Sequence, residues 1–445
     1  MSFDRTTLEL LSEAVAHLDA GFNELPAFAP NSNIDALRPI LLQAAQRMHD
    51  NYPYQHPLYA GQMLKPPHPL ARLTYAMAQF VNPNNHAMDG GRASSMMERE
   101  AVGELASMFG WTRHLGHLCG GGTMANMEAL WISNKINPGK KIIASDQAHY
   151  THGRISEVLQ IPFTSVASDA SGQIDLEILE KLLSEGEVGT IVATLGTTGL
   201  GATDPLPDIL KLARAHGARV HVDAAYGGYF TLIDDLMPQT RAAFNAISEA
   251  DSLVIDPHKH GLQPYGCGCV LFRDPAVGSH YKHNSPYTYF TSADLHLGEI
   301  SLECSRPGAA AVALWATQKH LPLIREGSFA SDLAKCRRAA KELFHRLNED
   351  KRFLTIIPPE LDIVLWAPRG KSASEISKSA QRMFNEAAAR GLHLALVSLS
   401  EKFLSACWPM VEFNQTSAIC LRSCLMKPEH EDWIEQIWEI LSATA

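Results

Sequence analysis

The sequence predicts an α/β protein with a large, mainly parallel sheet and a smaller α/β unit at the C-terminal end. Short apolar runs of strand length and composition occur at 141–144, 190–195, 219–222, 253–255 and 269–272. Stretches with helical periodicity separate several of them, as at 176–186 and 206–217. Strands that alternate with helices are typical of a parallel sheet covered on both faces.

The chain divides by composition into three expected units. Residues 1–65 hold one or two helical patterns followed by stretches rich in proline and asparagine. Such a segment cannot build its own core, so we expect an arm that lies over another unit or a partner subunit. Residues 66–315 contain the alternating helices and strands of the large domain. Residues 316–445 read as helix, strand, helix, two strands and a closing helix, which indicates a small C-terminal domain.

Composition narrows the function classes. In 445 residues, 46% of them hydrophobic, no apolar run approaches the length of about 20 residues that crosses a bilayer. The N-terminal segment carries acidic residues instead of a basic signal peptide, so we expect a cytoplasmic protein. A formal charge of -10 argues against nucleic acid or a membrane surface as partner. The eight cysteines are scattered and lack zinc spacing, so no metal site is expected.

Polar residues follow four of the expected strands directly. His149 comes after the run at 141–144, the sequence GTTGLG after 190–195, Asp223 after 219–222, and His258 and Lys259 after 253–255. Ligands of open parallel sheets bind beyond the carboxyl ends of the strands. We therefore expect hydroxyls, two histidines, an aspartate and a lysine at one edge.

A glycine run adds a phosphate-binding candidate. The sequence CGGGTMAN at 119–126 precedes a helical pattern, and free N–H groups at a helix N-terminus suit a phosphate. The run lacks the lysine of a Walker loop and the spacing of a dinucleotide fingerprint, so alone it is a weak signal. Taken singly, Lys259 reads as a surface lysine, Asp223 as a capping residue and His149 as a core histidine. Together, a phosphate cradle, an amine, a carboxylate and an imidazole are the groups that pyridoxal phosphate needs.

Five motifs in a specific order carry a family resemblance. They are GGGTMANMEAL, DQAHYTHGR, LGTTGLGATDP, HVDAAYGG and ADSLVIDPHKH. The sequence resembles the group II pyridoxal-phosphate-dependent amino acid decarboxylases, which include glutamate and aromatic amino acid decarboxylases and have the aspartate aminotransferase fold, fold type I. Weaker similarity extends to HPLYAGQ at 56–62 and to 421–437.

The resemblance implies roles for particular residues. Lys259 is similar to the lysine that forms a Schiff base with the cofactor, and Asp223 to the partner of the pyridine nitrogen. His149 and Ala225 correspond to the residues on the two faces of the ring, and His258 to a phosphate ligand. The remaining cofactor-binding candidates lie in segments that line the phosphate: Gly122, Thr123, Met124, Asn126 and Thr198.

The substrate side is less clearly marked. Arg422 resembles an arginine that receives the substrate α-carboxylate, and a guanidinium fork suits that group, although a strand arginine paired with a nearby acid fits as well. Gln62 resembles a substrate-side position of glutamate-type enzymes, while Tyr59 and Phe290 would equally serve an aromatic substrate. Arg306 receives no role here.

The family resemblance also implies a mobile-loop tyrosine that returns a proton to Cα, and Tyr287 and Tyr289 are both candidates. One departure concerns the residue after the lysine: the family commonly has tryptophan there, whereas this chain has His260. We expect that departure to lie near the substrate.

The resulting prediction is α-decarboxylation of an L-amino acid to a primary amine and CO2 by a homodimer. Another fold type I enzyme, a carbon–carbon lyase or an aldehyde-forming oxidative deaminase, would keep the same cofactor residues. A non-catalytic protein that binds pyridoxal phosphate is the alternative from a different class.

Overall fold

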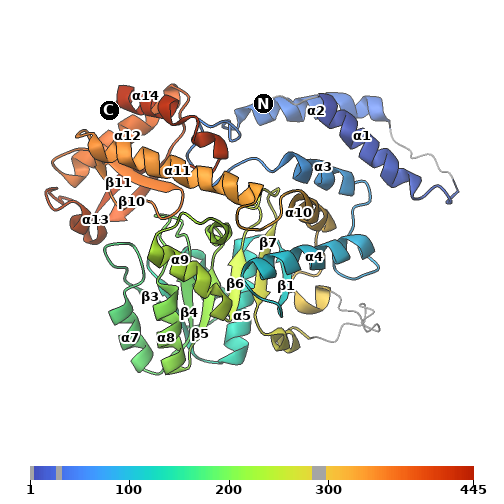
Figure 1. Ribbon diagram of the computed structural model, residues 1–445, viewed down its shortest axis with the longest axis horizontal. Helices are drawn as coiled ribbons and strands as arrows, with labels where there is room; N and C mark the ends of the chain where they lie inside the picture. The colour runs from blue at the N-terminus through green and yellow to red at the C-terminus, as the bar shows by residue number, and fades with distance from the viewer. Residues whose placement is uncertain (1–4, 27–32, 283–296) are drawn as a thin grey trace.

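The computed structural model describes residues 5–26, 33–282 and 297–445 and contains a seven-stranded and a four-stranded sheet (Figure 1). The strand order of the large sheet is β1 (Leu115–Cys119), β7 (Gly268–Phe272), β6 (Ser252–Ile255), β5 (Arg219–Asp223), β4 (Val188–Thr194), β2 (Lys141–Ser145) and β3 (Phe163–Val166). Neighbouring strands from β3 to β6 are parallel, and β7 runs antiparallel to both β6 and β1. The expected mainly parallel sheet is confirmed, with β1 and β3 as strands that the apolar runs did not indicate.

Helices cover both faces of the large sheet. Successive side chains of a strand point to opposite faces, and in β4 they enter different clusters: Ile191 and Ala193 join one, Val192 the other. The first cluster includes side chains from α4 (Arg92–Met108), α7 (Leu176–Ser184), α8 (Leu206–His216), α9 (Pro238–Asn245) and α10 (Gly308–His320). On the opposite face lie α5 (Gly122–Ile136) and α6 (Thr151–Val158). Helices therefore cover both faces of the sheet, and a ligand can approach at the ends of the strands.

The small sheet is antiparallel throughout, in the order β10 (Ala395–Ser400), β11 (Ser417–Cys424), β9 (Ile363–Pro368) and β8 (Phe353–Thr355). The helices of this unit are α11 (Ser328–Glu349), α12 (Ala373–Ala389), α13 (Glu401–Cys407) and α14 (Ile434–Thr444). Trp366 of β9 is fully buried in a core with Leu343 of α11 and Met383 of α12. The three-unit division remains a proposal, and residue 316 falls within α10.

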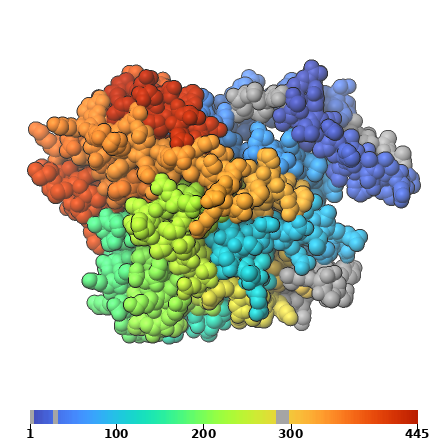
Figure 2. Space-filling view, in the orientation of Figure 1, coloured from blue at the N-terminus to red at the C-terminus, as the bar shows by residue number. Residues whose placement is uncertain are grey.

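The N-terminal region lies outside both sheets. Helices α1 (Arg5–Ala20) and α2 (Ile34–Arg47) have no buried residue, and α1 contacts α3 (Pro69–Ala78). They form the blue edge of the molecule in Figures 1 and 2. The following segment crosses to the small sheet, where Ala60 N donates to His393 O and Ala60 O accepts from Cys424 N, both at 2.8 Å. Among the described residues, no helix is both long and apolar enough to span a membrane.

The described 3₁₀ helices are short. They are η1 (Met48–Asp50), η2 (Gly228–Leu232), η3 (Ala246–Glu249), η4 (Pro275–His280), η5 (Leu297–Ile300) and η6 (Pro428–His430). Of these, η2 directly follows the turn after β5, which places its buried backbone beside the carboxyl end of the sheet.

Candidate functional site

A cavity of about 630 Å³ lies where the predicted strand ends meet. Its volume is in the usual range for small-molecule sites, about 300–1,000 Å³. The segments after β2, β4, β5 and β6 and the N-terminus of α5 all contribute to its wall. All ten predicted cofactor-binding residues lie on the wall: Gly122, Thr123, Met124, Asn126, His149, Thr198, Asp223, Ala225, His258 and Lys259. The sequence prediction of a shared site thus agrees with the geometry.

Lys259 reaches this cavity from the turn after β6. Lys259 N donates to Asp256 O at 2.9 Å, and its Nζ lies 3.0 Å from Asp256 Oδ2. The carboxylate is 3% exposed and the lysine side chain 22% exposed. The ion pair therefore holds the amine at the cavity wall, with one side open to a ligand.

Asp223 ends β5 and accepts hydrogen bonds on both carboxylate oxygens. Oδ1 accepts from Ala225 N at 3.1 Å, and Oδ2 accepts from His152 Nε2 at 2.9 Å and from Asn126 Nδ2 at 3.4 Å. Burial by itself would raise the pKa of this carboxyl, but the interactions with His152 and then Lys259 lower it below its ordinary value. An ionised carboxylate therefore faces the cavity.

His149 is the imidazole of the site. Its Nδ1 lies 2.8 Å from Thr151 Oγ1, and its ring packs against Tyr150 at 4.5 Å between centroids. Burial lowers the pKa of His149 below 6.5. A neutral imidazole held in this way can stack on a flat aromatic ring.

The glycine run forms an open cradle at the start of α5. Gly121 precedes the helix with φ 143°, and the helix N-terminus has no side-chain cap. A Cβ at Gly122 would lie 2.7 Å from Asp256 Oδ2, and one at Gly121 would lie 3.2 Å from His258 Cε1. His258 Nδ1 is buried without a hydrogen-bond partner among the described residues. Uncapped N–H groups and an unpartnered imidazole nitrogen beside one opening fit an anion such as phosphate.

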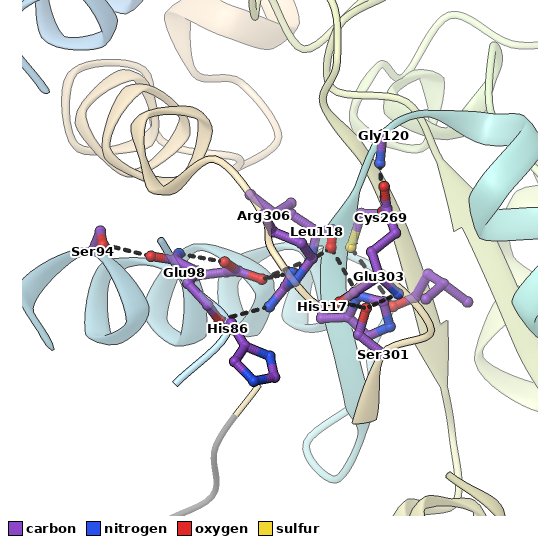
Figure 3. A network of polar contacts seen from close by, with 12 residues as sticks. His86, Ser94, Glu98, His117, Leu118, Gly120, Cys269, Ser301, Glu303 and Arg306 are labelled. Carbon is purple, nitrogen blue, oxygen red and sulfur yellow. Dashed lines mark hydrogen bonds and ion pairs between the residues drawn. The ribbon is translucent and has the colours of Figure 1, made fainter. Parts of the chain in front are cut away.

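Arg306 stabilises the strand that leads into this cradle (Figure 3). Its Nη1 donates to Glu98 Oε1 at 2.6 Å and to Leu118 O at 2.5 Å, and Nη2 donates to Asn85 O at 3.3 Å. Glu98 Oε1 also accepts from Leu118 N at 3.0 Å. This buried network fixes the end of β1 against α4, so Arg306 is structural in the described contacts.

On the substrate side, the structure brings Arg422 and Gln62 together from distant parts of the chain. Arg422 Nη2 donates to Gln62 Oε1 at 3.0 Å, and Nη1 donates to Thr198 O at 2.7 Å. Thr198 lines the cavity, whereas Arg422 lies behind it and is 7% exposed. Within the described ranges Arg422 has no acidic partner, so the alternative of a strand ion pair does not describe its contacts.

The expectation for His260 was wrong. It is 1% exposed, lies outside the cavity wall, and its Nε2 is 3.2 Å from Asp362 Oδ2 of the small unit. The turn after β6 sends consecutive side chains apart, so Lys259 faces the cavity and His260 the interior. Tyr59 is likewise buried, with its ring 5.0 Å from that of Tyr54. The candidates Tyr287, Tyr289 and Phe290 lie outside the described residues.

Sequence reasoning missed four residues of the site. Asp256 follows β6 in the same turn as Lys259, and His152 lies three residues after His149 at the start of α6, so both had a positional signal. Thr194 ends β4 and lines the cavity with an unpartnered hydroxyl among the described residues. Glu303 Oε2 accepts from Gly120 N at 2.9 Å and comes from a segment far along the chain, which no local pattern indicated.

The donor set fits pyridoxal phosphate on structural grounds. One wall offers an amine, a second an ionised carboxylate, a third a neutral imidazole and a fourth an uncapped helix N-terminus. These match the cofactor's aldehyde, ring nitrogen, ring face and phosphate.

Comparison with known proteins agrees with this fit. The family model described as "Pyridoxal-dependent decarboxylase conserved domain" matches residues 123–367, more than half of the chain. A probable L-tyrosine/L-aspartate decarboxylase of Methanothermobacter thermautotrophicus is 29% identical over 317 residues, which are 69% of this chain and 82% of the relative. The L-aspartate decarboxylase of Thermococcus kodakarensis is 29% identical over 294 residues, 63% of this chain and 72% of the relative.

The fold has a close counterpart among solved structures. The crystal structure of mouse CSAD superposes with a TM-score of 0.80 at 19% identity and covers 99% of each chain. That likeness confirms the predicted fold type I architecture. With the family match and the cavity chemistry, it leads to one conclusion: the chain belongs to the pyridoxal-dependent decarboxylase family and is an amino acid decarboxylase whose cofactor is pyridoxal phosphate.

Proposed function

We propose that Lys259, Asp223 and His149 are the residues with which this chain removes the α-carboxylate of an L-amino acid as CO2 and leaves a primary amine. The observation that carries the assignment is their convergence on one cavity with an uncapped helix N-terminus. Lys259 Nζ would hold the cofactor aldehyde, and Asp223 would face the ring nitrogen. His258 and the first residues of α5 would bind the phosphate.

Each residue has a distinct task in this proposal. Bound pyridoxal phosphate supplies the electron sink for the electron pair that stays on Cα when CO2 leaves. Asp223, ionised and buried, would keep a proton on the ring nitrogen. His149 and Ala225 would hold the ring plane from its two faces. Asp256 keeps Lys259 Nζ at the cavity wall, 3.0 Å from its Oδ2. Tyr287 or Tyr289 remains our proposal for the group that returns the proton to Cα.

For the substrate, we propose an acidic amino acid, with L-aspartate as the first candidate. Two relatives named for L-aspartate decarboxylation support this choice. Arg422 would receive the α-carboxylate, since its guanidinium has Nε without a partner among the described residues and its Nη2 is bound by the exposed Gln62. A carboxylate offers Arg422 stronger, charge-assisted hydrogen bonds than an amide oxygen does.

We also propose a cytoplasmic homodimer. The eight cysteines are all unpaired, which suits a reducing compartment. Helix α2 exposes several large apolar side chains: Ile34, Leu37, Ile40, Leu41 and Leu42. A second copy of the chain would cover this face. Sedimentation equilibrium checks the assembly, and a fully active monomer would contradict it.

The decisive experiment for the reaction is a substrate panel. Holoenzyme is incubated with each common amino acid, L-aspartate, L-glutamate and L-tyrosine included, and mass spectrometry identifies the product. We expect the amine of one acidic amino acid, and we expect the Lys259→Ala variant to form none. Full turnover by that variant would overturn the assignment, and an aldehyde with peroxide in place of the amine would indicate an oxidative deaminase.

A further inference from the structure

The environment of Asp223 contains a histidine that the reaction described above does not use. His152 is the second residue of α6 and is 1% exposed, and its Nε2 lies 2.9 Å from Asp223 Oδ2. It does not line the cavity, so it reaches the cofactor site only through this carboxylate. Its Nδ1 is buried and has no hydrogen-bond partner in the described part of the chain. Among the described residues, the hydrogen bond to Asp223 is thus the polar contact that the His152 ring makes.

We propose that His152 is a positioning residue that keeps the Asp223 carboxylate ionised and oriented toward the cofactor ring nitrogen. This inference rests on the role of Asp223 given under the proposed function. A carboxylate has about four acceptor positions. Ala225 N takes one on Oδ1, and His152 and Asn126 take two on Oδ2. One position remains, and Asp223 lines the cavity.

Removing the His152 donor acts on the charge of the carboxylate. Burial disfavours the ionised form of an aspartate, and here the hydrogen bond and electrostatic interaction with His152 are the largest effects that oppose burial. Without them the carboxyl is more readily protonated. A neutral carboxyl lacks the negative charge that stabilises a protonated ring nitrogen. The weaker contact from Asn126, at 3.4 Å, is poorly placed to compensate.

The neighbouring titratable groups do not replace His152. The groups that act on Asp223 or lie beside it are Lys259, His149 and His221. Lys259 is engaged by a different carboxylate, burial lowers the pKa of His149, and burial lowers that of His221 from 6.5 to about 3. A neutral imidazole at either histidine adds no positive charge next to the aspartate.

The test measures the protonation of the ring nitrogen directly. Holoenzyme is prepared with ¹⁵N-labelled pyridoxal phosphate, and the ¹⁵N chemical shift is followed against pH for the wild type, His152→Leu and His152→Gln. We expect the wild type to keep the proton on the ring nitrogen. In His152→Leu the nitrogen should lose that proton at a pH at least about one unit lower, which corresponds to a ten-fold weaker proton affinity. His152→Gln should restore the wild-type behaviour, because its amide donates from a similar position. We expect kcat of His152→Leu to fall about 10- to 100-fold with a smaller change in KM.

Two further variants separate the possible outcomes. His260→Leu removes another buried imidazole from an aspartate, Asp362, and should leave the ¹⁵N shift unchanged in folded holoenzyme. Asp223→Asn should abolish the ring proton. If Asp223→Asn keeps it, the proposed role of Asp223 is wrong. If Asp223→Asn loses it and His152→Leu keeps it, only the inference on His152 is overturned. Should His152→Leu not fold, His152→Asn replaces it, because its amide is too short to reach Asp223 as the glutamine does.

Discussion

Two of the buried histidine–aspartate pairs near Lys259 differ in what else the aspartate touches. In the first, His152 Nε2 is 2.9 Å from Asp223 Oδ2, and Asp223 also lines the cavity. In the second, His260 Nε2 is 3.2 Å from Asp362 Oδ2, and Asp362 Oδ1 accepts from Tyr226 OH at 2.7 Å. The first carboxylate has a side open to a ligand, while the second is fully enclosed between the two sheets.

The comparison shows that the kind of pair does not decide its role. Both aspartates have a pKa below the ordinary value although burial alone would raise it, because a histidine stabilises the charge in each case. What differs is the rest of the surroundings: Asp223 lines the cavity, whereas Asp362 Oδ1 accepts a hydrogen bond from Tyr226 OH. The same kind of pair therefore lies at the proposed cofactor site in one place and joins the segment after β6 to the segment before β9 in the other.

The largest effect is expected for Asp223→Asn. The substitution keeps the shape but removes the charge that would hold the ring proton, so kcat/KM should fall about 100- to 1,000-fold, as when one preorganised electrostatic group is lost. Amine release measures it. The matched variant Asp362→Asn, assayed where it remains folded, should lose less than about 10-fold. Equal losses in the two variants would break the distinction between the pairs.

The next effect concerns the free energy of unfolding, and here Asp362, not Asp223, is the aspartate with the predicted effect. Burial lowers the pKa of His260, so Asp362→Asn removes a buried carboxylate acceptor beside a neutral imidazole, and a buried polar group left without its partner costs about 1–3 kcal/mol. Urea unfolding measures this loss. Glu435→Gln is the control: it removes an exposed partner of Arg346 and should cost less than about 1 kcal/mol. A similarly small loss for Asp362→Asn would contradict a structural role.

As the pH falls, the free energy of unfolding should decrease first through His221, near the first pair, and only at lower pH through the aspartates. Burial lowers the pKa of His221, which bonds to Asn126, from 6.5 to about 3, so below pH 6.5 the unfolded state binds a proton that the folded state does not. The stabilising contribution is present above about pH 6.5 and is lost as the pH falls toward 3, by at most about 1.4 kcal/mol per pH unit. Asp223, with its lowered pKa, loses its contribution only below its ordinary value of 3.8. Urea unfolding of His221→Asn should show a shallower slope between pH 6.5 and 4 than the wild type, and an identical slope would be evidence against a neutral His221.

The smallest effect is expected at Gln62, which belongs to neither pair. Gln62 Oε1 orients Arg422 Nη2 at 3.0 Å, and loss of one such hydrogen bond corresponds to about 0.5–1.5 kcal/mol. Gln62→Ala should therefore raise KM about two- to ten-fold with kcat nearly unchanged. Gln62→Glu should raise KM further, because its carboxylate competes with that of the substrate for Arg422. Unchanged KM in both variants would argue against Arg422 as the carboxylate site.

Most of the fold could be predicted because the central strands are continuous apolar runs. β4, β5, β6 and β7 are buried along nearly their whole length, so most of them appear in the sequence as largely apolar runs. β3 lies at the sheet edge, and only Val166 of its four residues is buried, so its sequence carries little signal. β1 contains Gly116 and a buried His117 that is paired with Glu128 at 3.0 Å. A polar residue satisfied by a distant partner does not resemble a strand in sequence.

The cofactor side of the site could be predicted for a similar reason, because His149, Asp223 and Lys259 follow recognisable strands, and the remaining candidates include the glycine run at the start of α5. The substrate side depends on tertiary contacts. Arg422 and Gln62 are 360 positions apart, and the direction of His260 is set by the turn after β6, which the sequence alone does not reveal. The difference between Asp223, which lines the cavity, and Asp362, which does not, became visible only from the position of the cavity.

The central claim is that Lys259 holds the cofactor, and a competing amine exists. Lys427 is 3% exposed, its Nζ donates to Tyr59 O at 2.6 Å, and burial lowers its pKa from 10.5 to about 7, which favours a reactive amine. It lies outside the cavity wall. Reduction of holoenzyme with borohydride followed by peptide mass mapping locates the attached pyridoxyl group. The account predicts a single labelled peptide that contains Lys259. A label on Lys427, or no labelled lysine in an enzyme that turns over, would contradict it.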